Sequence, residues 1–184
     1  MCPCHGRRPP DVLARPPVGP CPTSSATSDV DLVALVYFDS SALVKLVVEE
    51  PGSSLVAQLW DGCDAALASR LAYPEVRAAL AAAARSHDLG HDDLRDAEQA
   101  WQEFWAATRP VELTPAVERH AGELAREHAL RGADAVHLAS ALAIGEPDLI
   151  VAVWDRRLHA GALAAGTNVA PAVIPSPSPG SIRS

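Results

Sequence analysis

The residues from Leu32 to Phe38 form a continuous apolar run, and an aspartate, Asp39, follows it directly. A strand covered on one face alternates apolar and polar residues, whereas a strand buried on both faces is apolar throughout. The run therefore predicts a central strand with helices on both sides. Such strands occur in parallel sheets, whose neighbouring strands are joined by helical crossovers. This one segment points to an α/β fold.

The rest of the chain repeats the pattern of short apolar segments separated by amphipathic ones. We expect strands at 32–38, 64–69, 109–113, 149–153 and 168–174, and helices at 40–50, 53–61, 73–87, 91–107, 115–132, 133–144 and 156–165. Strands that alternate with helices predict a three-layer α/β domain with a central parallel sheet flanked by helices. The length of 184 residues suits one such domain.

Proline marks the ends of this domain. Of the 16 prolines, seven lie in residues 1–22 and four lie in residues 171–184. Segments rich in proline form neither regular hydrogen bonds nor a periodic apolar face. We therefore expect a disordered N-terminal tail over 1–31, a folded domain over 32–174 and a flexible C-terminal tail over 175–184.

Three of the four cysteines, Cys2, Cys4 and Cys21, lie in the N-terminal tail beside His5. These side chains could bind zinc, but their spacing matches no compact zinc finger. The alternative is that translation starts later, near Val30, and that the tail is not part of the working protein.

The charge of the chain limits how it can interact with nucleic acid. The formal net charge is −8, and residues 32–174 hold 11 basic against 20 acidic residues, a net charge of −9. This balance excludes binding of nucleic acid through bulk positive charge. It does not exclude an enzyme whose carboxylates hold a cation. No apolar run reaches the roughly 18 residues that a membrane-spanning helix needs.

Four acidic residues fall where predicted strands or loops lead into helices: Asp39, Glu75, Asp134 and Asp155. Functional groups of parallel α/β sheets gather at the carboxyl ends of the strands. Taken singly, each acid has a structural explanation as a favourable charge at a helix start. Taken together, converging carboxylates repel one another unless a cation lies among them. Carboxylate oxygens suit Mg²⁺ or Mn²⁺.

Four stretches that include these acids resemble motifs of a known family, in the family's order. They are YFDSSALVK (37–45), SRLAYPEVR (69–77), GADAVHLASA (132–141) and WDRRL (154–158). The family is that of the PIN-domain nucleases, and specifically the VapC toxins of type II toxin–antitoxin pairs. The resemblance extends over roughly residues 33–174.

The resemblance implies a PIN fold and a cytoplasmic Mg²⁺-dependent endoribonuclease, with Mn²⁺ as a possible substitute. The expected catalytic residues are Asp39, Glu75, Asp134 and Asp155. We expect Asp39 and Asp134 to bind the metal directly, and Glu75 and Asp155 to complete the site through water or a second ion. The products would carry a 5′-phosphate and a 3′-hydroxyl. The implied partners are an RNA substrate, a VapB-like antitoxin and a second copy of the chain.

The sequence departs from the family pattern just ahead of the fourth acid. Many relatives have Thr or Ser there, whereas this chain has Val153-Trp154. A hydroxyl that could orient Asp155 is therefore missing. Another motif residue, His137, lies one helical turn after Asp134. Such a D-x-x-H pair could bind metal, but the resemblance implies a packing or supporting role for His137. Lys45, the only lysine, is expected to be exposed on its helix.

The first two predicted helices are more apolar than one side of a small sheet requires. The residues concerned are Leu43, Val44, Leu46, Val47, Leu55, Val56, Leu59 and Trp60. An exposed apolar surplus marks a candidate interface. The resemblance implies that an antitoxin's apolar helix docks here, and the alternative is that these side chains are core. The other aromatic pair, Trp101 and Trp105, is expected in the core or in an interface.

Two other functions remain open at this point. The chain could be a PIN-fold module that binds RNA or antitoxin without cutting, although it keeps all four acids. It could also be another Mg²⁺–aspartate enzyme. A phosphatase of the haloacid-dehalogenase type would have a second aspartate where Ser41 lies, and a receiver domain would have a lysine late in the chain. Both fit poorly.

The predicted boundary leads to a first test. A version of the protein that begins at Val30 is expected to fold and to cleave RNA like the full chain, because the first strand starts only at about Leu32. Circular dichroism and an RNA-cleavage assay on both lengths check this. Loss of folding or of cleavage in the shorter protein would show that residues 1–29 are needed.

Overall fold

A computed structural model describes residues 34–174 and contains a five-stranded sheet. The strands are β1 (Leu35–Phe38), β2 (Ala65–Ser69), β3 (Arg109–Val111), β4 (Ile150–Ala152) and β5 (Asn168–Ala170). They lie in the order β3-β2-β1-β4-β5, and every neighbouring pair is parallel. The prediction of a parallel α/β sheet is confirmed, and β1 lies at its centre.

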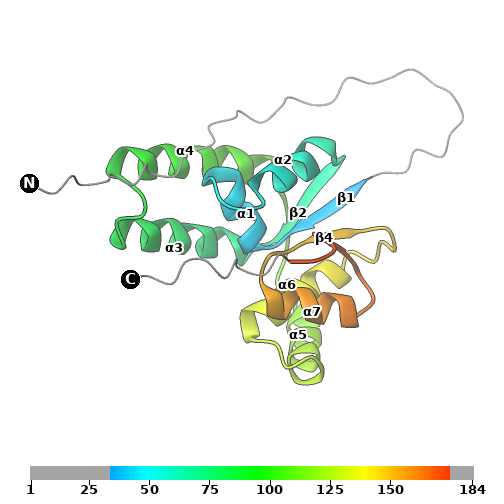
Figure 1. Cartoon of the computed structure of the whole chain (residues 1–184). Helices are drawn as coiled ribbons and strands as arrows, with labels where there is room; N and C mark the ends of the chain where they lie inside the picture. The colour runs from blue at the N-terminus through cyan, green and yellow to red at the C-terminus, as the bar shows by residue number, and fades with distance from the viewer. Residues whose placement is uncertain (1–33, 175–184) are drawn as a thin grey trace, which may run out of the picture.

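Seven helices of the described region cover the two faces of this sheet. They are α1 (Ser40–Val47), α2 (Ser53–Gly62), α3 (Ala72–Arg85), α4 (His91–Ala107), α5 (Pro115–Glu127), α6 (Gly132–Leu142) and α7 (Arg156–Ala164). Figure 1 shows α1–α4 on one side of the sheet and α5–α7 on the other. The three-layer arrangement follows from the right-handed crossovers that join parallel strands.

The central strand β1 sends alternate side chains into two separate cores. Val36 and Phe38 pack in the cluster formed with α1–α4, whereas Tyr37 packs in the cluster formed with α5–α7. All three side chains are at most 2% exposed. Successive side chains of a strand point to opposite faces, so the continuous apolar run is explained by burial on both faces.

Several predicted elements extend too far at one end. The helix expected over 40–50 ends at Val47, because Val48 is extended and Gly52 has a left-handed conformation with φ +102°. The helix expected over 115–132 ends at Glu127, and Ala129 then takes a left-handed conformation. In both cases the backbone conformation of the following turn ends the helix, although the apolar pattern of the sequence continues further.

Lys45 is not exposed, contrary to the expectation from the sequence. It is 8% exposed, its Nζ lies 2.6 Å from Glu50 Oε2, and it lies 5.8 Å from the ring centroid of Trp154. The ion pair and the aromatic face replace part of the water that burial removes.

The apolar surplus of the first two helices is mostly core. Leu43, Leu46, Val47 and Val56 are at most 4% exposed, and the remaining apolar side chains of these helices are only partly exposed. The helix α1 lies between β1 and the α3–α4 pair and is therefore buried on most of its circumference. These four side chains cannot form an exposed docking surface.

The aromatic residues of α4 are part of the same core, as expected. Trp101 is fully buried and packs against Trp105, with ring centroids 5.5 Å apart. The predicted tails and the cysteine–histidine cluster of the N-terminal tail lie outside the described residues. Within residues 34–174, no helix is long and apolar enough to cross a membrane.

The turn between α1 and α2 depends on a glycine beneath Trp154. A Cβ on Gly52 would lie 2.5 Å from Trp154 Nε1, and the φ of +102° is unfavourable for any other residue. We expect Gly52→Ala to lower the free energy of unfolding by about 1–3 kcal/mol, measured by urea denaturation. Gly62→Ala is the control, because nothing lies within 4 Å of its added Cβ. Equal effects of the two changes would contradict this account of the turn.

Candidate active site

The four predicted acids lie at four helix starts. Asp39 directly follows β1 and caps α1, and Asp155 follows β4 and caps α7. Glu75 lies in the first turn of α3, and Asp134 lies in the first turn of α6. We call these four residues the acidic edge. Each carboxylate is stabilised by the positive end of a helix dipole. This agrees with the explanation of each single acid as a favourable charge at a helix start.

Asp39 and the backbone of Asp155 are joined by one hydroxyl group. Ser41 Oγ lies 2.8 Å from Asp39 Oδ1, to which it donates. The same oxygen accepts hydrogen bonds from the backbone N–H groups of Trp154, at 2.8 Å, and Asp155, at 3.2 Å. A serine hydroxyl has one proton and two lone pairs, so Ser41 uses its full capacity to hold the end of β1 against the turn after β4.

Asp39 is a buried carboxylate. It is 4% exposed, and burial raises its pKa above the usual range. The nearby His137 and hydrogen bonds from Ser41 and the Ala42 backbone offset part of this effect. The ionised form of Asp39 is therefore electrostatically unfavourable in the protein alone.

Glu75 is held by two neighbours from other helices. His137 Nε2 lies 2.7 Å from Glu75 Oε2, and the Ser40 hydroxyl donates to the same carboxylate oxygen. Burial opposes ionisation of Glu75, but the hydrogen bonds from His137 and Ser40 outweigh it and lower the pKa. Glu75 is thus kept as a carboxylate.

Asp134 and Asp155 form a repulsive pair. Burial raises the pKa of Asp134, and the charge of Asp155 raises it further. Asp155 itself accepts hydrogen bonds from the backbone N–H groups of Arg157 and Leu158, at 2.8 and 2.9 Å. Asp134 has only a long contact of 3.4 Å from the Arg131 N–H. Two facing carboxylates of this kind would be stabilised by a cation.

The acidic edge suits a divalent cation in its chemistry. All four candidate ligands are carboxylates, and two of them, Asp39 and Asp134, have raised pKa values. Within residues 34–174, no three His, Cys, Asp or Glu side chains lie close enough together to enclose a metal ion by themselves. Mg²⁺ is commonly bound by one or two carboxylates plus waters and substrate phosphate. The residues therefore fit Mg²⁺ better than an ion that needs a complete protein cage.

The sequence did not reveal two of the supporting side chains. Ser41 provides a hydroxyl to the Asp155 side of the site, and Tyr37 contacts His137 from the strand. The signal for Ser41 was its place two residues after Asp39, where a side chain in the first helical turn reaches back to the cap. Tyr37 carried no signal, because a tyrosine within an apolar strand is first explained as core.

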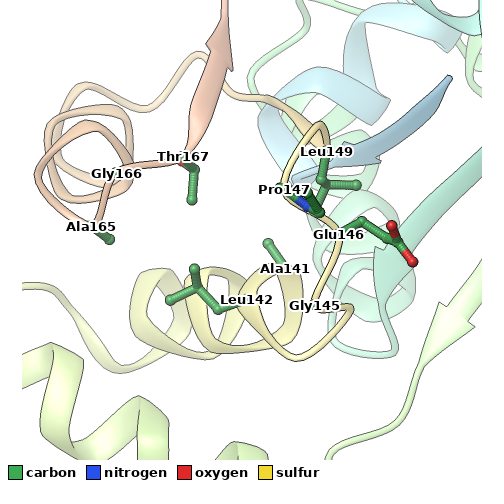
Figure 2. A pocket seen from close by; sticks show the side chains of 9 residues that line it. All are labelled: Ala141, Leu142, Gly145, Glu146, Pro147, Leu149, Ala165, Gly166 and Thr167. Atoms are coloured by element: carbon green, nitrogen blue, oxygen red, sulfur yellow. The ribbon is translucent and has the colours of Figure 1, made fainter. Parts of the chain in front are cut away.

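A separate cavity lies at the other end of α6. It has a volume of about 220 Å³ and is formed by the end of α6, the start of β4 and the end of α7 (Figure 2). Its lining is Ala141, Leu142, Gly145, Glu146, Pro147, Leu149, Ala165, Gly166 and Thr167. Glu146 is the only ionisable residue of this lining, so the cavity offers no constellation for catalysis.

Comparison with known proteins agrees with the fold. Residues 36–161 match the PIN domain family. The match covers more than half of the chain and includes all four acids. The chain therefore belongs to the PIN-domain family.

Relatives within this family are of the VapC type. The chain is 76% identical over 140 residues to Ribonuclease VapC45 of Mycobacterium tuberculosis strain CDC 1551 / Oshkosh and to Ribonuclease VapC49 of strain ATCC 25618 / H37Rv. Each alignment covers 76% of this chain and 97% of the relative. The crystal structure of FitAcB from Neisseria gonorrhoeae has the same fold, with a TM-score of 0.57 and 17% identity over 73% of this chain and 96% of that one.

Burial and the charge of Asp155 make ionisation of Asp134 unfavourable, and this can be measured as a pH dependence of stability. Its pKa is raised in the folded protein, so ionisation costs stability as the pH rises through that pKa. Asn at this position stays neutral. We expect Asp134→Asn to gain free energy of unfolding relative to the unmodified protein between about pH 4 and pH 7, in urea denaturation with EDTA present.

The control for this comparison is Glu123→Gln, which removes one charge from an exposed position on α5. Its stability difference from the unmodified protein is expected to change little with pH. Parallel pH profiles for Asp134→Asn and the unmodified protein would show that ionisation of Asp134 is not unfavourable in the folded protein.

Proposed function

We propose that the protein is a Mg²⁺-dependent endoribonuclease and the toxin of a type II toxin–antitoxin pair. The observation that supports this most is the 76% identity to two proteins named as VapC ribonucleases, combined with all four acids at helix starts along one edge. Mn²⁺ is a possible substitute for Mg²⁺ because both prefer oxygen ligands.

In this proposal Asp39 and Asp134 hold the cation. Burial raises the pKa of both carboxyl groups, and the charge of Asp155 raises that of Asp134 further, so a bound cation would offset an unfavourable ionisation. When bound, the ion would lower the pKa of a water molecule and neutralise charge on the scissile phosphate. Asp155 completes the proposed metal site, and its backbone N–H is held by Ser41.

Glu75 has the properties of a group that orients the attacking water or accepts its proton. It is half-buried, and its pKa is lowered, so a carboxylate faces the site. One of its oxygens is engaged by His137 and Ser40. The other, Oε1, is the atom that we assign to the water. Hydrolysis by this route would leave a 5′-phosphate and a 3′-hydroxyl on the RNA.

The proposal also explains how an acidic domain can act on RNA. Residues 32–174 have a net charge of −9, so the phosphate backbone is repelled at long range. Attraction has to come from the cation and from local arginines. Activity should therefore depend on the metal more steeply than it would in a basic nuclease.

The proposed partners are a VapB-like antitoxin and a second copy of the chain, acting in the cytoplasm. The support is membership of the family and the identity to VapC relatives. Of the eight apolar side chains considered for docking on the first two helices, those left partly exposed are Val44, Leu55, Leu59 and Trp60. Any antitoxin contact in this region has to use these residues, since the others are core.

The central test is neutralisation of one proposed metal ligand. Asp39→Asn is expected to lower RNA cleavage in Mg²⁺ by more than ~100-fold, because the amide loses the negative charge that holds the ion near the transition state. Mg²⁺ is expected to raise the melting temperature of the unmodified protein and to do much less for Asp39→Asn. Cleavage of fluorescent RNA and thermal denaturation measure the two effects.

Glu103→Gln is the matched control, because Glu103 is exposed on α4 away from the acidic edge. It should keep both cleavage and the metal-induced shift. Undiminished cleavage by Asp39→Asn would refute the proposed site. An unmodified protein that binds RNA without cutting it in Mg²⁺ or Mn²⁺ would favour the alternative of an inactive PIN-fold binding module.

A further inference from the structure

A buried chain of hydrogen bonds leads from the sheet to Glu75. The Tyr37 hydroxyl accepts from the Ser69 backbone N–H, at 3.2 Å, and lies 2.9 Å from His137 Nδ1. On the other side of the imidazole ring, Nε2 lies 2.7 Å from Glu75 Oε2. Tyr37 is fully buried and His137 is 3% exposed. We call Ser69, Tyr37, His137 and Glu75 the buried hydrogen-bond chain.

The chemistry of the two ends determines where the protons lie. The Ser69 N–H can only donate, so the Tyr37 oxygen is the acceptor in that contact. This leaves the single hydroxyl proton of Tyr37 free for His137 Nδ1. At the other end, the Glu75 carboxylate can only accept, so Nε2 has to carry the proton of that contact. Both requirements are met by one tautomer of a neutral ring.

The competing arrangement turns the Tyr37 hydroxyl toward Ser140 and places the imidazole proton on Nδ1. Ser140 Oγ is buried and makes no hydrogen bond of normal geometry, but it lies near enough to Tyr37 to offset part of the rise that burial causes in the pKa of the phenol. In that tautomer, the lone pair of Nε2 would face a carboxylate oxygen at 2.7 Å. Two acceptors at this distance repel each other.

We propose that Tyr37 and His137 are positioning residues for the acidic edge: the Tyr37 hydroxyl donates to Nδ1 in the Nε2–H tautomer of His137, and that N–H aims the Glu75 carboxylate. The part of this inference that concerns catalysis rests on the proposed nuclease function. The hydrogen-bond chain itself does not.

The buried hydrogen-bond chain connects the two helical layers of the fold. Glu75 is on α3, in the layer of α1–α4, whereas His137 and the Tyr37 side chain belong to the layer of α5–α7. Asp134 lies one turn before His137 on α6. The buried hydrogen-bond chain therefore sets the position of Glu75 relative to Asp134 across the edge of the sheet.

The same geometry argues against His137 as a metal ligand. A histidine binds a metal through an unprotonated ring nitrogen. Here Nδ1 is occupied by Tyr37, and Nε2 is occupied by Glu75 and also lies 3.2 Å from Ser40 Oγ. Both nitrogens are thus engaged by protein groups, which is the pattern of a residue that orients another side chain.

The tautomer can be read directly by long-range ¹H–¹⁵N correlation on the ¹⁵N-labelled full chain, without metal or RNA. We expect a protonated Nε2 and an unprotonated Nδ1 at His137. In Tyr37→Phe, which keeps the buried ring but removes the donor to Nδ1, we expect the Nδ1 resonance to shift, while the contact with Glu75 keeps Nε2 protonated. Protonation of Nδ1 in the unmodified protein, alone or together with Nε2, would overturn the inference.

Two amide substitutions at His137 separate positioning from packing. The amide nitrogen of Gln reaches about as far as Nε2, whereas that of Asn reaches only about as far as Nδ1. We expect His137→Asn to lower kcat by ~10–100-fold, the usual effect of losing a partner that orients a catalytic group, with KM for RNA unchanged. His137→Gln should recover most of kcat, because it can still donate to Glu75.

Equal kcat values for the Gln and Asn variants would show that His137 only fills space and would overturn the positioning role. If Tyr37→Phe does not fold, the tautomer of the unmodified protein and the His137 pair still decide the question. If the unmodified protein does not cleave RNA at all, the proposed function fails, while the NMR measurement still tests the hydrogen-bond chain.

Discussion

The structure depends on keeping a carboxylate buried at the end of its central strand. Asp39 is 4% exposed, and an ion in such a place loses hydration worth several kcal/mol unless polar groups replace the water. The replacement comes from the first turn of α1, where the Ala42 N–H and the Ser41 hydroxyl donate to Asp39. Because β1 is buried on both faces, the residue after it starts in the interior. The helix therefore has to begin at once, and α1 does so at Ser40.

This local solution organises the rest of the acidic edge. Ser41 also accepts from the backbone of Trp154 and Asp155, which joins the turn after β4 to the end of β1. Ser40, on the neighbouring position, donates to Glu75. The first turn of α1 thus contacts two other acids besides its own cap. Even so, the pKa values of Asp39 and Asp134 stay raised. The electrostatics at this edge are therefore unfavourable in the protein alone, and the proposed cation would offset them.

Much of the fold could be predicted from the sequence, because β1 and the amphipathic helices carry local periodicity. The four acids could be located for the same reason: strand ends and helix starts are visible in the pattern. Burial of α1 could not be predicted, since a helix covered by other helices has the same composition as one with an exposed apolar face. Leu46 shows this, because it was expected in an interface and lies in the core. Lys45 was misjudged because Glu50 and Trp154 cover it only in three dimensions.

The Val153-Trp154 departure from the family pattern is best explained by Ser41. A hydroxyl just ahead of the fourth acid would orient Asp155 from its own strand. Here the hydroxyl comes from α1 instead and holds the backbone of the same turn. Position 154 is then free to hold a large side chain, which packs over Gly52 and beside Lys45. The backbone of Asp155 is thus supported from α1, and the Trp154 ring beside it packs over the turn between α1 and α2. A side chain at Gly52 would displace the Trp154 ring, and because Asp155 is the next residue in the chain, we expect the displacement to reach Asp155.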